Sequence, residues 1–282
     1  MIQCVICKNS KNLKKKFTNL LECSQCGHIF ANLNLDFSKV QDLYNDDYFF
    51  GNEYINYIKD KKQIQKNANL RVKLIKRFSH KFLKQNLFEI GCAYGFFLNF
   101  VKKKFNYVEG IDVNNEAIEY GKKNFNIDIS CDDFETKNIE KNKFNIFCMW
   151  DVIEHLQNPD IYLKKINKIS QKNSLLCITT GDIKSFNAKL NGKNWRLIHP
   201  PTHIHYFSKE TIKKILENNN FEIINFEHCG YYRNLSFILN KINFLTKYFS
   251  WLIKILTFLK IDNLDIYLNI YDIMFIIPKE IN

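Results

Sequence analysis

The sequence predicts an α/β protein, a mostly parallel sheet covered by helices on both faces, with a small N-terminal module in front of it. The main observation is that residues 81–282 alternate apolar runs of strand length with segments of helical periodicity. The second is a pair of C-x-x-C motifs within residues 1–35, which indicates a metal-binding module. Residues 36–80 join these parts, and an apolar helical insertion is expected at 234–262. The 282 residues, 46% of them hydrophobic, suffice for a sizeable core and exclude global disorder.

The cysteine spacing is the strongest local signal in the chain. Cys4 and Cys7 form one C-x-x-C motif, and Cys23 and Cys26 form the other. Each motif can present two thiolates from a tight turn, and two such turns complete a tetrahedral Zn²⁺ site. Gly27 follows the second motif, where such a turn needs a permissive backbone. Four unrelated core thiols, or a redox C-x-x-C, would not need this paired spacing. We therefore expect a structural zinc site with a closed coordination shell.

A tyrosine-rich stretch, residues 43–57, joins the module to the main domain. It has the sequence LYNDDYFFGNEYINY, and this aromatic and acidic composition is unusual for a flexible linker. The stretch is either a packed surface loop or a flap that closes over a ligand. In the second case the capping groups would be Tyr44, Tyr48, Phe49 and Tyr54. If the ligand is a cofactor, we expect Tyr48 to contact it.

Residues 61–79 are predicted to form a helix that covers one face of the sheet. Its apolar residues recur at intervals of three and four, which places them on one stripe of a helix. The stripe consists of Ile64, Ala68, Val72, Ile75 and Phe78.

The main domain begins with the run NLFEIGCAYGFFLNFVKKKF, which indicates a strand, a glycine turn and a helix. Further strands are predicted at YVEGID, IDIS, FNIFCMW, SLLCITT, FEIINFEH and YDIMFIIPK. Further helices are predicted at NEAIEYGKKNF, from near residue 152, and at SKETIKKILENNN. Ser208 suits the N-cap of the last helix, because its hydroxyl can accept a backbone N–H. Ligands of such parallel sheets bind beyond the C-terminal ends of the strands.

The turn after the first strand is suited to ligand binding. Gly91 lets the chain turn sharply, and Gly95 lets a ligand approach the backbone closely. The turn is not a GxGxxG dinucleotide fingerprint, because Ala93 stands at the middle position and the spacing differs. Asp112 ends the second strand, where a carboxylate can bind ribose hydroxyls. Residues 132–134, two acids and an aromatic after the third strand, could hold an adenine.

Together these motifs resemble those of the class I S-adenosylmethionine-dependent methyltransferases. The segments FEIGCAYG, GIDVNNEAI, CDDFE and FNIFCMWDVIEHLQNPDIYLKKI are similar to successive motifs of that family. The resemblance spans roughly residues 40–280. It implies a Rossmann-like seven-stranded sheet whose last two strands form an antiparallel pair. It also implies that S-adenosylmethionine is bound by Glu89, Gly91, Ala93 and Gly95 at its methionine end, by Asp112 at the ribose, and by Asp133 and Phe134 at the adenine.

The chain most resembles the subgroup with an N-terminal cysteine module. Members commonly methylate small metabolites, including nucleotide-linked sugars and surface-glycan precursors. The segments HPPTHIHYFS and LNIYDIMFIIPK also look like that subgroup. The resemblance therefore implies O-methylation of a small polar metabolite, in a polysaccharide biosynthesis setting. The departures are Ala93 and Asn145, which stand where the family often has a glycine and an acid.

One candidate catalytic cluster follows the fourth strand. Asp151, Glu154 and His155 have i, i+3 and i+4 spacing, which would place them on one side of a helical turn. Ubiquinone-biosynthesis O-methyltransferases carry a similar run, linked to a divalent cation. Three interpretations stay open: His155 is a base, the three residues hold a divalent cation, or they cap and pack.

A second candidate lies in WRLIHPPTHIHYFS, residues 195–208, which should roof the acceptor pocket after the fifth strand. A hydroxyl acceptor needs a base with a pKa near working pH, which is the range of histidine. His203 and His205 are two residues apart, so an extended chain would point them the same way. We expect His203 to face the acceptor, with His205 as a further catalytic candidate. Substrate contacts are expected from Trp195, His199 and Tyr206.

The net charge of +12 comes with scattered lysines and no arginine-rich block, which favours a lysine-rich composition over a nucleic-acid partner. An RNA methyltransferase with a zinc module is the first alternative function, and a non-catalytic scaffold that keeps the fold is the second. The N-terminus has no apolar signal-peptide core, so we expect a cytoplasmic protein with reduced cysteines.

The segment 234–260 is very apolar, and lysines interrupt it at near-heptad intervals. It is too interrupted for a spanning helix. It is expected to pack on the domain, to join two subunits as a homodimer, or to lie on an anionic membrane surface.

Overall fold

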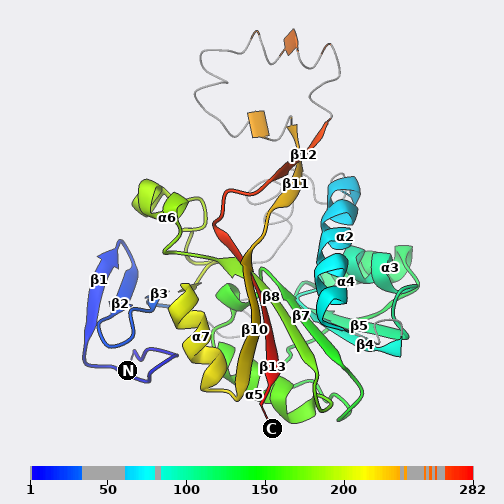
Figure 1. Cartoon of the computed structure of the whole chain (residues 1–282), viewed down its shortest axis with the longest axis horizontal. Coiled ribbons are helices and arrows are strands. Elements are labelled where there is room, and N and C mark those ends of the chain that lie inside the picture. The colour runs from blue at the N-terminus through cyan, green and yellow to red at the C-terminus, as the bar shows by residue number, and fades with distance from the viewer. Residues whose placement is uncertain are drawn as a thin grey trace.

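The structure is a computed structural model of the chain (Figure 1). It describes residues 2–33, 61–79, 84–235 and 264–281, together with residues 238, 239, 251, 254, 255 and 258. The predicted flap at 43–57, with Tyr48, lies outside the described residues, as does most of the predicted insertion at 234–262.

A seven-stranded sheet forms the centre of the main domain (Figure 1). Across the sheet the order is β10 (Phe221–His228), β13 (Ile273–Glu280), β8 (Leu175–Gly181), β7 (Ile146–Trp150), β4 (Asn86–Ile90), β5 (Tyr107–Asp112) and β6 (Asp128–Cys131). The five strands from β8 to β6 are parallel, and β13 enters antiparallel between β8 and β10. This arrangement confirms the predicted fold class, including the antiparallel pair of the last two strands.

Helices cover both faces of the sheet, as predicted (Figure 1). They are α2 (Lys61–Phe78), α3 (Phe96–Val101), α4 (Asn115–Asn124), α5 (Pro159–Ile169) and α7 (Lys209–Glu217). A further helix, α6 (Phe186–Asn191), packs against the loop that contains Trp195 and Leu197. Neighbouring residues of a strand point to opposite faces. Leu87 of β4 therefore packs in one core with α2, α3 and α4, whereas Phe88 packs in the other with α5 and α7. The predicted stripe of α2 is buried at Ala68, Val72 and Ile75.

The helix expected from near residue 152 begins later than predicted. Ile153–His155 form a 3-10 turn, η3, and α5 starts at Pro159. Pro159 suits the first turn of a helix, where its missing N–H is not needed. The same proline disfavours the helical conformation at Asn158 before it, so the helix cannot extend back to η3.

The N-terminal module forms a four-stranded sheet, and one strand comes from the main domain. β1 (Leu13–Phe17), β2 (Leu20–Cys23) and β3 (Ile29–Ala31) are antiparallel neighbours. β3 then pairs with β9 (His205–Tyr206), with Ile29 opposite Tyr206 and Phe30 opposite His205. The module is thus joined by backbone hydrogen bonds to the histidine-rich segment.

A small two-stranded sheet, β11 (Tyr231–Asn234) and β12 (Asp265–Leu268), lies against the end of α2. The side chain of Asn67 accepts the Tyr232 N–H at 2.6 Å and donates to the Tyr232 carbonyl at 3.2 Å. These two bonds fix β11 on α2.

The described residues between β11 and β12 include large apolar side chains in contact with solvent. Trp251, Ile255 and Phe258 are exposed. Among the described helices, none has the length and apolar character needed to cross a membrane.

Candidate active site

The four cysteines of the module converge on one point. Their Sγ atoms lie within 4.8 Å of one another. The shortest contacts, both 3.5 Å, join the Sγ atoms of Cys4 and Cys26 and those of Cys7 and Cys23. Thiolates held at about 2.3 Å by a tetrahedral Zn²⁺ are about 3.8 Å apart, so this donor set fits that ion. Gly27 has the predicted left-handed φ, 76°, and Lys8 takes the equivalent position after the first motif with φ 57°.

The turn after β4 takes left-handed backbone conformations at three positions. Gly91, Ala93 and Gly95 have φ angles of 75°, 46° and 71°. The Asp112 carboxylate, at the end of β5, accepts the Ala93 N–H at 2.7 Å and the Asn114 N–H at 2.9 Å. The predicted ribose position therefore lies directly against the predicted methionine-binding turn.

Glu89 is buried just before this turn and keeps an unsatisfied oxygen. It is 3% exposed, and its Oε2 has no hydrogen-bond partner within the described part of the chain. Burial raises the pKa of Glu89 to about 8, with Arg71 opposing and Asp112 adding to that effect. A buried acceptor without a partner is unfavourable, so this oxygen fits the polar methionine end of S-adenosylmethionine.

The residues predicted to hold the adenine have other contacts. Phe134 is 1% exposed and packs against Phe88 and Tyr162, with ring centroids 5.9 and 5.2 Å away. Its ring is therefore part of the core. Asp133 accepts the Glu135 N–H at 2.9 Å and the Tyr162 hydroxyl at 3.1 Å. Its carboxylate thus shapes the turn after β6.

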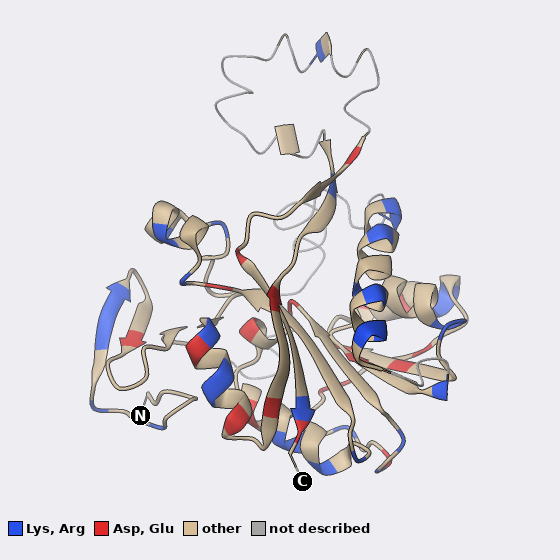
Figure 2. Ribbon diagram, in the orientation of Figure 1, with Lys and Arg blue, Asp and Glu red and all other residues tan. Residues whose placement is uncertain are grey.

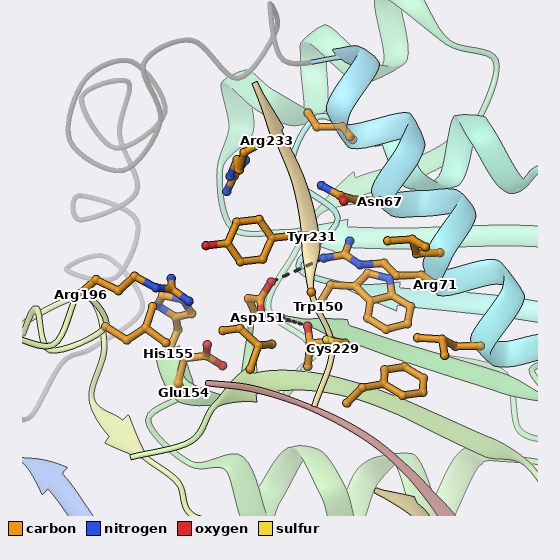
Figure 3. Close-up of a pocket in the computed structure, with 18 of the residues that line it drawn as sticks. Asn67, Arg71, Trp150, Asp151, Glu154, His155, Arg196, Cys229, Tyr231 and Arg233 are labelled. Carbon is orange, nitrogen blue, oxygen red and sulfur yellow. Dashed lines mark hydrogen bonds and ion pairs between the residues drawn. The ribbon is translucent and has the colours of Figure 1, made fainter. Parts of the chain in front are cut away.

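A cavity of about 190 Å³ lies at the C-terminal ends of β7 and β8 (Figure 3). Residues at the ends of both strands form its floor, including Trp150 and Thr179. α2 and β11 close two sides, and the predicted acceptor loop, residues 195–208, closes another through Arg196, Leu197 and His203. The cavity is therefore located where the sequence predicts an acceptor site.

His155 and His203 line this cavity in the same tautomer. The Nδ1 atoms lie 2.9 Å from backbone carbonyls, that of Thr202 for His155 and that of Leu197 for His203. Because a carbonyl only accepts, each Nδ1 carries the proton and each Nε2 keeps a lone pair. The ring centroids are 4.5 Å apart. Burial lowers the pKa of His155 to about 4 and that of His203 well below its ordinary value, so both are neutral at neutral pH.

Glu154 completes a cluster of three potential ligands. A carboxyl oxygen of Glu154 and one ring nitrogen each of His155 and His203 lie within 4.8 Å of one another. Burial, and then the neighbouring Asp151 carboxylate, raises the pKa of Glu154 to about 8. Two neutral imidazoles and one carboxyl group can act as bases or hold a divalent cation.

Asp151 is not part of this cluster, which corrects its expected place beside Glu154 and His155. The residue has φ 56°, and its carboxylate lies 3.5 Å from the guanidinium of Arg71 (Figure 3). The left-handed conformation directs Asp151 toward α2, whereas η3 directs Glu154 toward His203.

His199 and Tyr206 support His203. His199 Nδ1 lies 2.6 Å from the Thr202 hydroxyl, and its ring centroid lies 3.8 Å from that of His203. The Tyr206 hydroxyl donates to the His203 carbonyl at 2.8 Å. Neither is among the residues that line the cavity.

Trp195 is also placed behind the wall of the cavity. It is 2% exposed and donates its indole N–H to Asp272 at 3.0 Å. Asp272 also accepts a hydrogen bond from the guanidinium of Arg196, with 2.9 Å between the nitrogen and Oδ1. Trp195 is therefore not among the residues that line this cavity, whereas its neighbour Arg196 is.

His205 lies against the N-terminal module instead of the cavity. Its Nδ1 is 3.0 Å from Nε2 of His28, and both residues are buried. Burial lowers the pKa of His205 to about 4. The expectation that His203 and His205 point the same way is wrong, because the extended strand β9 begins only at His205.

A family model described as a methyltransferase domain matches residues 61–225, which is more than half of the chain. The chain belongs to this methyltransferase family. No curated protein matches it. Since the fold also agrees, the protein is an S-adenosylmethionine-dependent methyltransferase.

Solved methyltransferase structures share this fold. Magnesium protoporphyrin IX methyltransferase from Synechocystis PCC 6803 has a TM-score of 0.56 at 13% identity, covering 87% of this chain and 100% of that one. An S-adenosylmethionine-dependent methyltransferase from Thermotoga maritima has a TM-score of 0.55 at 14% identity, covering 88% and 100%. A Haloferax volcanii complex of the Trm112 methyltransferase activator with a methyltransferase has a TM-score of 0.57 at 8% identity, covering 80% and 95%. At these identities the likeness shows the fold alone.

Sequence reasoning missed several cavity residues, namely Asn67, Arg71, Arg196, Tyr231 and Arg233. They come from three separate segments that no shared motif connects. The composition held one signal for the three arginines among them. Arginine is rare in this lysine-rich chain, so each arginine was a candidate for a specific role.

Proposed function

We propose that this methyltransferase methylates a hydroxyl oxygen of a small polar metabolite, such as a sugar, a nucleotide-linked sugar or a surface-glycan precursor. The observation that carries the proposal is the neutral imidazole of His203, which lines the cavity beyond β7 and β8 and has its Nδ1 proton on the Leu197 carbonyl, so that the lone pair is on Nε2. A hydroxyl must lose its proton as it attacks a methyl group, and a neutral imidazole can receive it.

S-adenosylmethionine supplies the methyl group and the leaving group, so the protein mainly has to orient the two reactants. Glu89 and the turn 91–95 would hold its methionine end, and Asp112 would hold the ribose. Asp133 stays the proposed contact for the adenine, and Tyr48 stays a proposed capping residue.

His203 is the proposed base. As the new C–O bond forms, the acceptor proton passes to Nε2 of His203. The Leu197 carbonyl, which accepts from Nδ1 at 2.9 Å, stabilises the resulting imidazolium. His155 is the alternative base, because its ring has an equivalent hydrogen bond to Thr202.

A divalent cation is a second way to activate the same hydroxyl. The residues that would hold it are Glu154, His155 and His203, since Asp151 is paired with Arg71. We propose titration of the purified protein with Mn²⁺, read by its electron paramagnetic resonance signal. Binding that His203→Ala and Glu154→Gln both abolish would support this role, and no binding would leave His203 as a simple base.

For the N-terminal module we propose a structural Zn²⁺ on Cys4, Cys7, Cys23 and Cys26. Four thiolates close the coordination shell, so this ion would take no part in the chemistry. Metal analysis of the purified protein tests the proposal, and a metal-free protein of unchanged stability would refute it.

The deciding experiment is methyl transfer from labelled S-adenosylmethionine into an extract of the source cells, separated into RNA, protein and small molecules with glycans. Label in the small-molecule or glycan fraction supports the proposal. Label in RNA would favour the nucleic-acid alternative, although Figure 2 shows the basic residues spread over β1, α2 and α7. Absence of label in every fraction would favour the scaffold.

Asp112→Ala is the matched negative control for that experiment. The substitution removes the carboxylate that joins the cofactor turn to α4, and we expect S-adenosylmethionine binding to be abolished while the protein stays folded. Calorimetric titration with S-adenosylmethionine checks this, and unchanged affinity would contradict the cofactor assignment.

The segment 234–260 stays a proposed contact surface, for a second subunit or an anionic membrane. The cytoplasmic location likewise stays a proposal. Sedimentation of the purified protein, with and without anionic vesicles, would distinguish contact with a second subunit from contact with a membrane.

A further inference from the structure

Three of the four arginines in the chain line the cavity. Lysine and arginine together number 41, but the arginines are only Arg71, Arg77, Arg196 and Arg233. All except Arg77 line the cavity, and none of the described lysines does. A guanidinium binds carboxylate or phosphate oxygens through two parallel N–H bonds, whereas an ammonium acts as a point charge. In so lysine-rich a chain, this placement indicates recognition of an oxyanion.

Two of these guanidinium groups lie close to the same aromatic ring. Arg196 lies 5.7 Å and Arg233 lies 5.1 Å from the centroid of the Tyr231 ring (Figure 3). Such cation–π contacts hold a guanidinium group in place. Arg196 is also held from behind by Asp272, which is buried. β11, which carries Tyr231 and Arg233, is fixed to α2 by Asn67. The site is therefore largely formed before a ligand arrives.

The third guanidinium lies nearer the floor of the cavity. Arg71 stacks on Trp150, 4.7 Å from a ring centroid of the indole, and contacts Asp151 at 3.5 Å. Among the described residues that line the cavity, the acidic ones are Asp151 and Glu154. Three guanidinium groups thus meet at this cavity, and two of them have a carboxylate beside them, Asp151 for Arg71 and Asp272 for Arg196.

We infer that Arg196 and Arg233, both beside Tyr231, bind an oxyanion of the acceptor, a phosphoryl or carboxylate group. The inference rests on the proposed function, because it places the anionic end of the acceptor at β11 and the reacting hydroxyl at His203. It narrows the acceptor from polar metabolites in general to anionic ones.

The test is calorimetric titration of the full chain, loaded with S-adenosylhomocysteine, with glucose 1-phosphate, glucuronate and glucose. The two anionic probes separate a phosphoryl from a carboxylate ligand, and glucose is the neutral control. We expect at least one anion to bind about tenfold or more tightly than glucose, since hydrogen bonds to charged groups contribute that much. Equal binding of all three probes, or binding of neither anion, would overturn the inference.

Arg233→Gln removes one guanidinium and should weaken anion binding about tenfold or more, with glucose binding unchanged. Arg77→Gln is the matched control, because Arg77 lies on α2 and pairs with Glu227 away from the cavity lining. Arg196→Lys is the second variant, chosen because it keeps a cation beside buried Asp272 while losing the bidentate geometry. Equal weakening by Arg233→Gln and Arg77→Gln would show a general charge effect and contradict the site.

The titrations are repeated without S-adenosylhomocysteine. If the protein does not bind S-adenosylhomocysteine, the proposed methyltransferase cofactor site fails. The comparison of Arg233→Gln with Arg77→Gln still decides the oxyanion site in that case.

Discussion

The segment 195–208 contributes to two regions of the molecule, the cavity and the cysteine module. His203 and His205 are each 6% exposed, and burial lowers the pKa of both. His203 has its Nδ1 on a backbone carbonyl and lines the cavity, whereas His205 is paired with His28. Two histidines of equal burial thus differ only in what lies opposite them, and this decides which one can meet a substrate.

The two regions are also connected through one residue. The Ile204 N–H donates to the Glu154 carbonyl at 2.9 Å, and the Ile204 carbonyl accepts the Ala31 N–H at 2.8 Å. A line of backbone hydrogen bonds therefore runs from β3 of the module to the η3 turn of the cavity. We expect substitutions that destabilise the module to displace His203 as well, whereas a substitution at His203 should leave the module folded.

His203→Ala should have the largest effect. It removes the proposed base, and general-base catalysis contributes about 10²–10⁴-fold. Turnover, measured with the extract fraction that accepts label, should fall by that factor, while the affinity for S-adenosylhomocysteine and the zinc content stay unchanged. Full activity would instead assign the base to His155.

Cys23→Ser should affect both regions. It removes one proposed ligand of the zinc ion, and a structural zinc site contributes several kcal/mol to folding. We expect loss of bound zinc, a lower unfolding temperature and reduced turnover, because β9 loses the support of β3. Cys131→Ser, outside the module, serves as the control. Unchanged turnover despite loss of zinc would contradict the proposed coupling between the module and the cavity.

His205→Phe should reduce stability more than chemistry. It leaves the buried His28 Nε2 without its partner, which costs about 1–3 kcal/mol in the free energy of unfolding. The double substitution His28→Phe and His205→Phe should recover much of this loss, since an apolar pair leaves no unsatisfied nitrogen. Urea unfolding measures both. If the single substitution abolished turnover at unchanged stability, His205 would have a chemical role after all.

Glu154→Gln should change the pH dependence of stability. The pKa of this carboxyl is raised from 4.5 to about 8 on folding, so between those values the folded protein binds a proton that the unfolded chain lacks. Stability from this group is therefore present below about pH 4.5 and is lost as the pH rises toward 8. The variant has no carboxyl group at this position and does not lose this stability. Its free energy of unfolding should therefore rise, relative to that of the wild type, by on the order of 1–3 kcal/mol between pH 5 and pH 8. Parallel pH profiles in urea unfolding would contradict the raised pKa; Glu89, which is common to both proteins, cancels from the comparison.

Local periodicity and spacing predicted much of the fold. The apolar stripe of α2, the alternation of strands and helices, and the capping of α7 by Ser208 all agree with the structure. The C-x-x-C spacing likewise predicted four thiols that converge. These features depend on residues close in sequence, and the repeats of helices and strands are local.

The remaining features depend on residues far apart in sequence. The burial of Phe134 follows from its packing against Phe88 and Tyr162, and the pairing of His205 follows from the seating of β3 on β9. No local pattern contains these contacts.

The sequence by itself thus determined the fold class, the cysteine cluster and the glycine turn after β4, because each depends on residues close together in the sequence. Only the tertiary structure decided which side chains meet in the cavity. Arg71, Arg196 and Arg233 are brought together by the packing of α2, the acceptor loop and β11 at one end of the sheet. The physical reason is that a side chain acquires its chemical role from the groups packed opposite it, and those groups are chosen by topology rather than by neighbours along the chain.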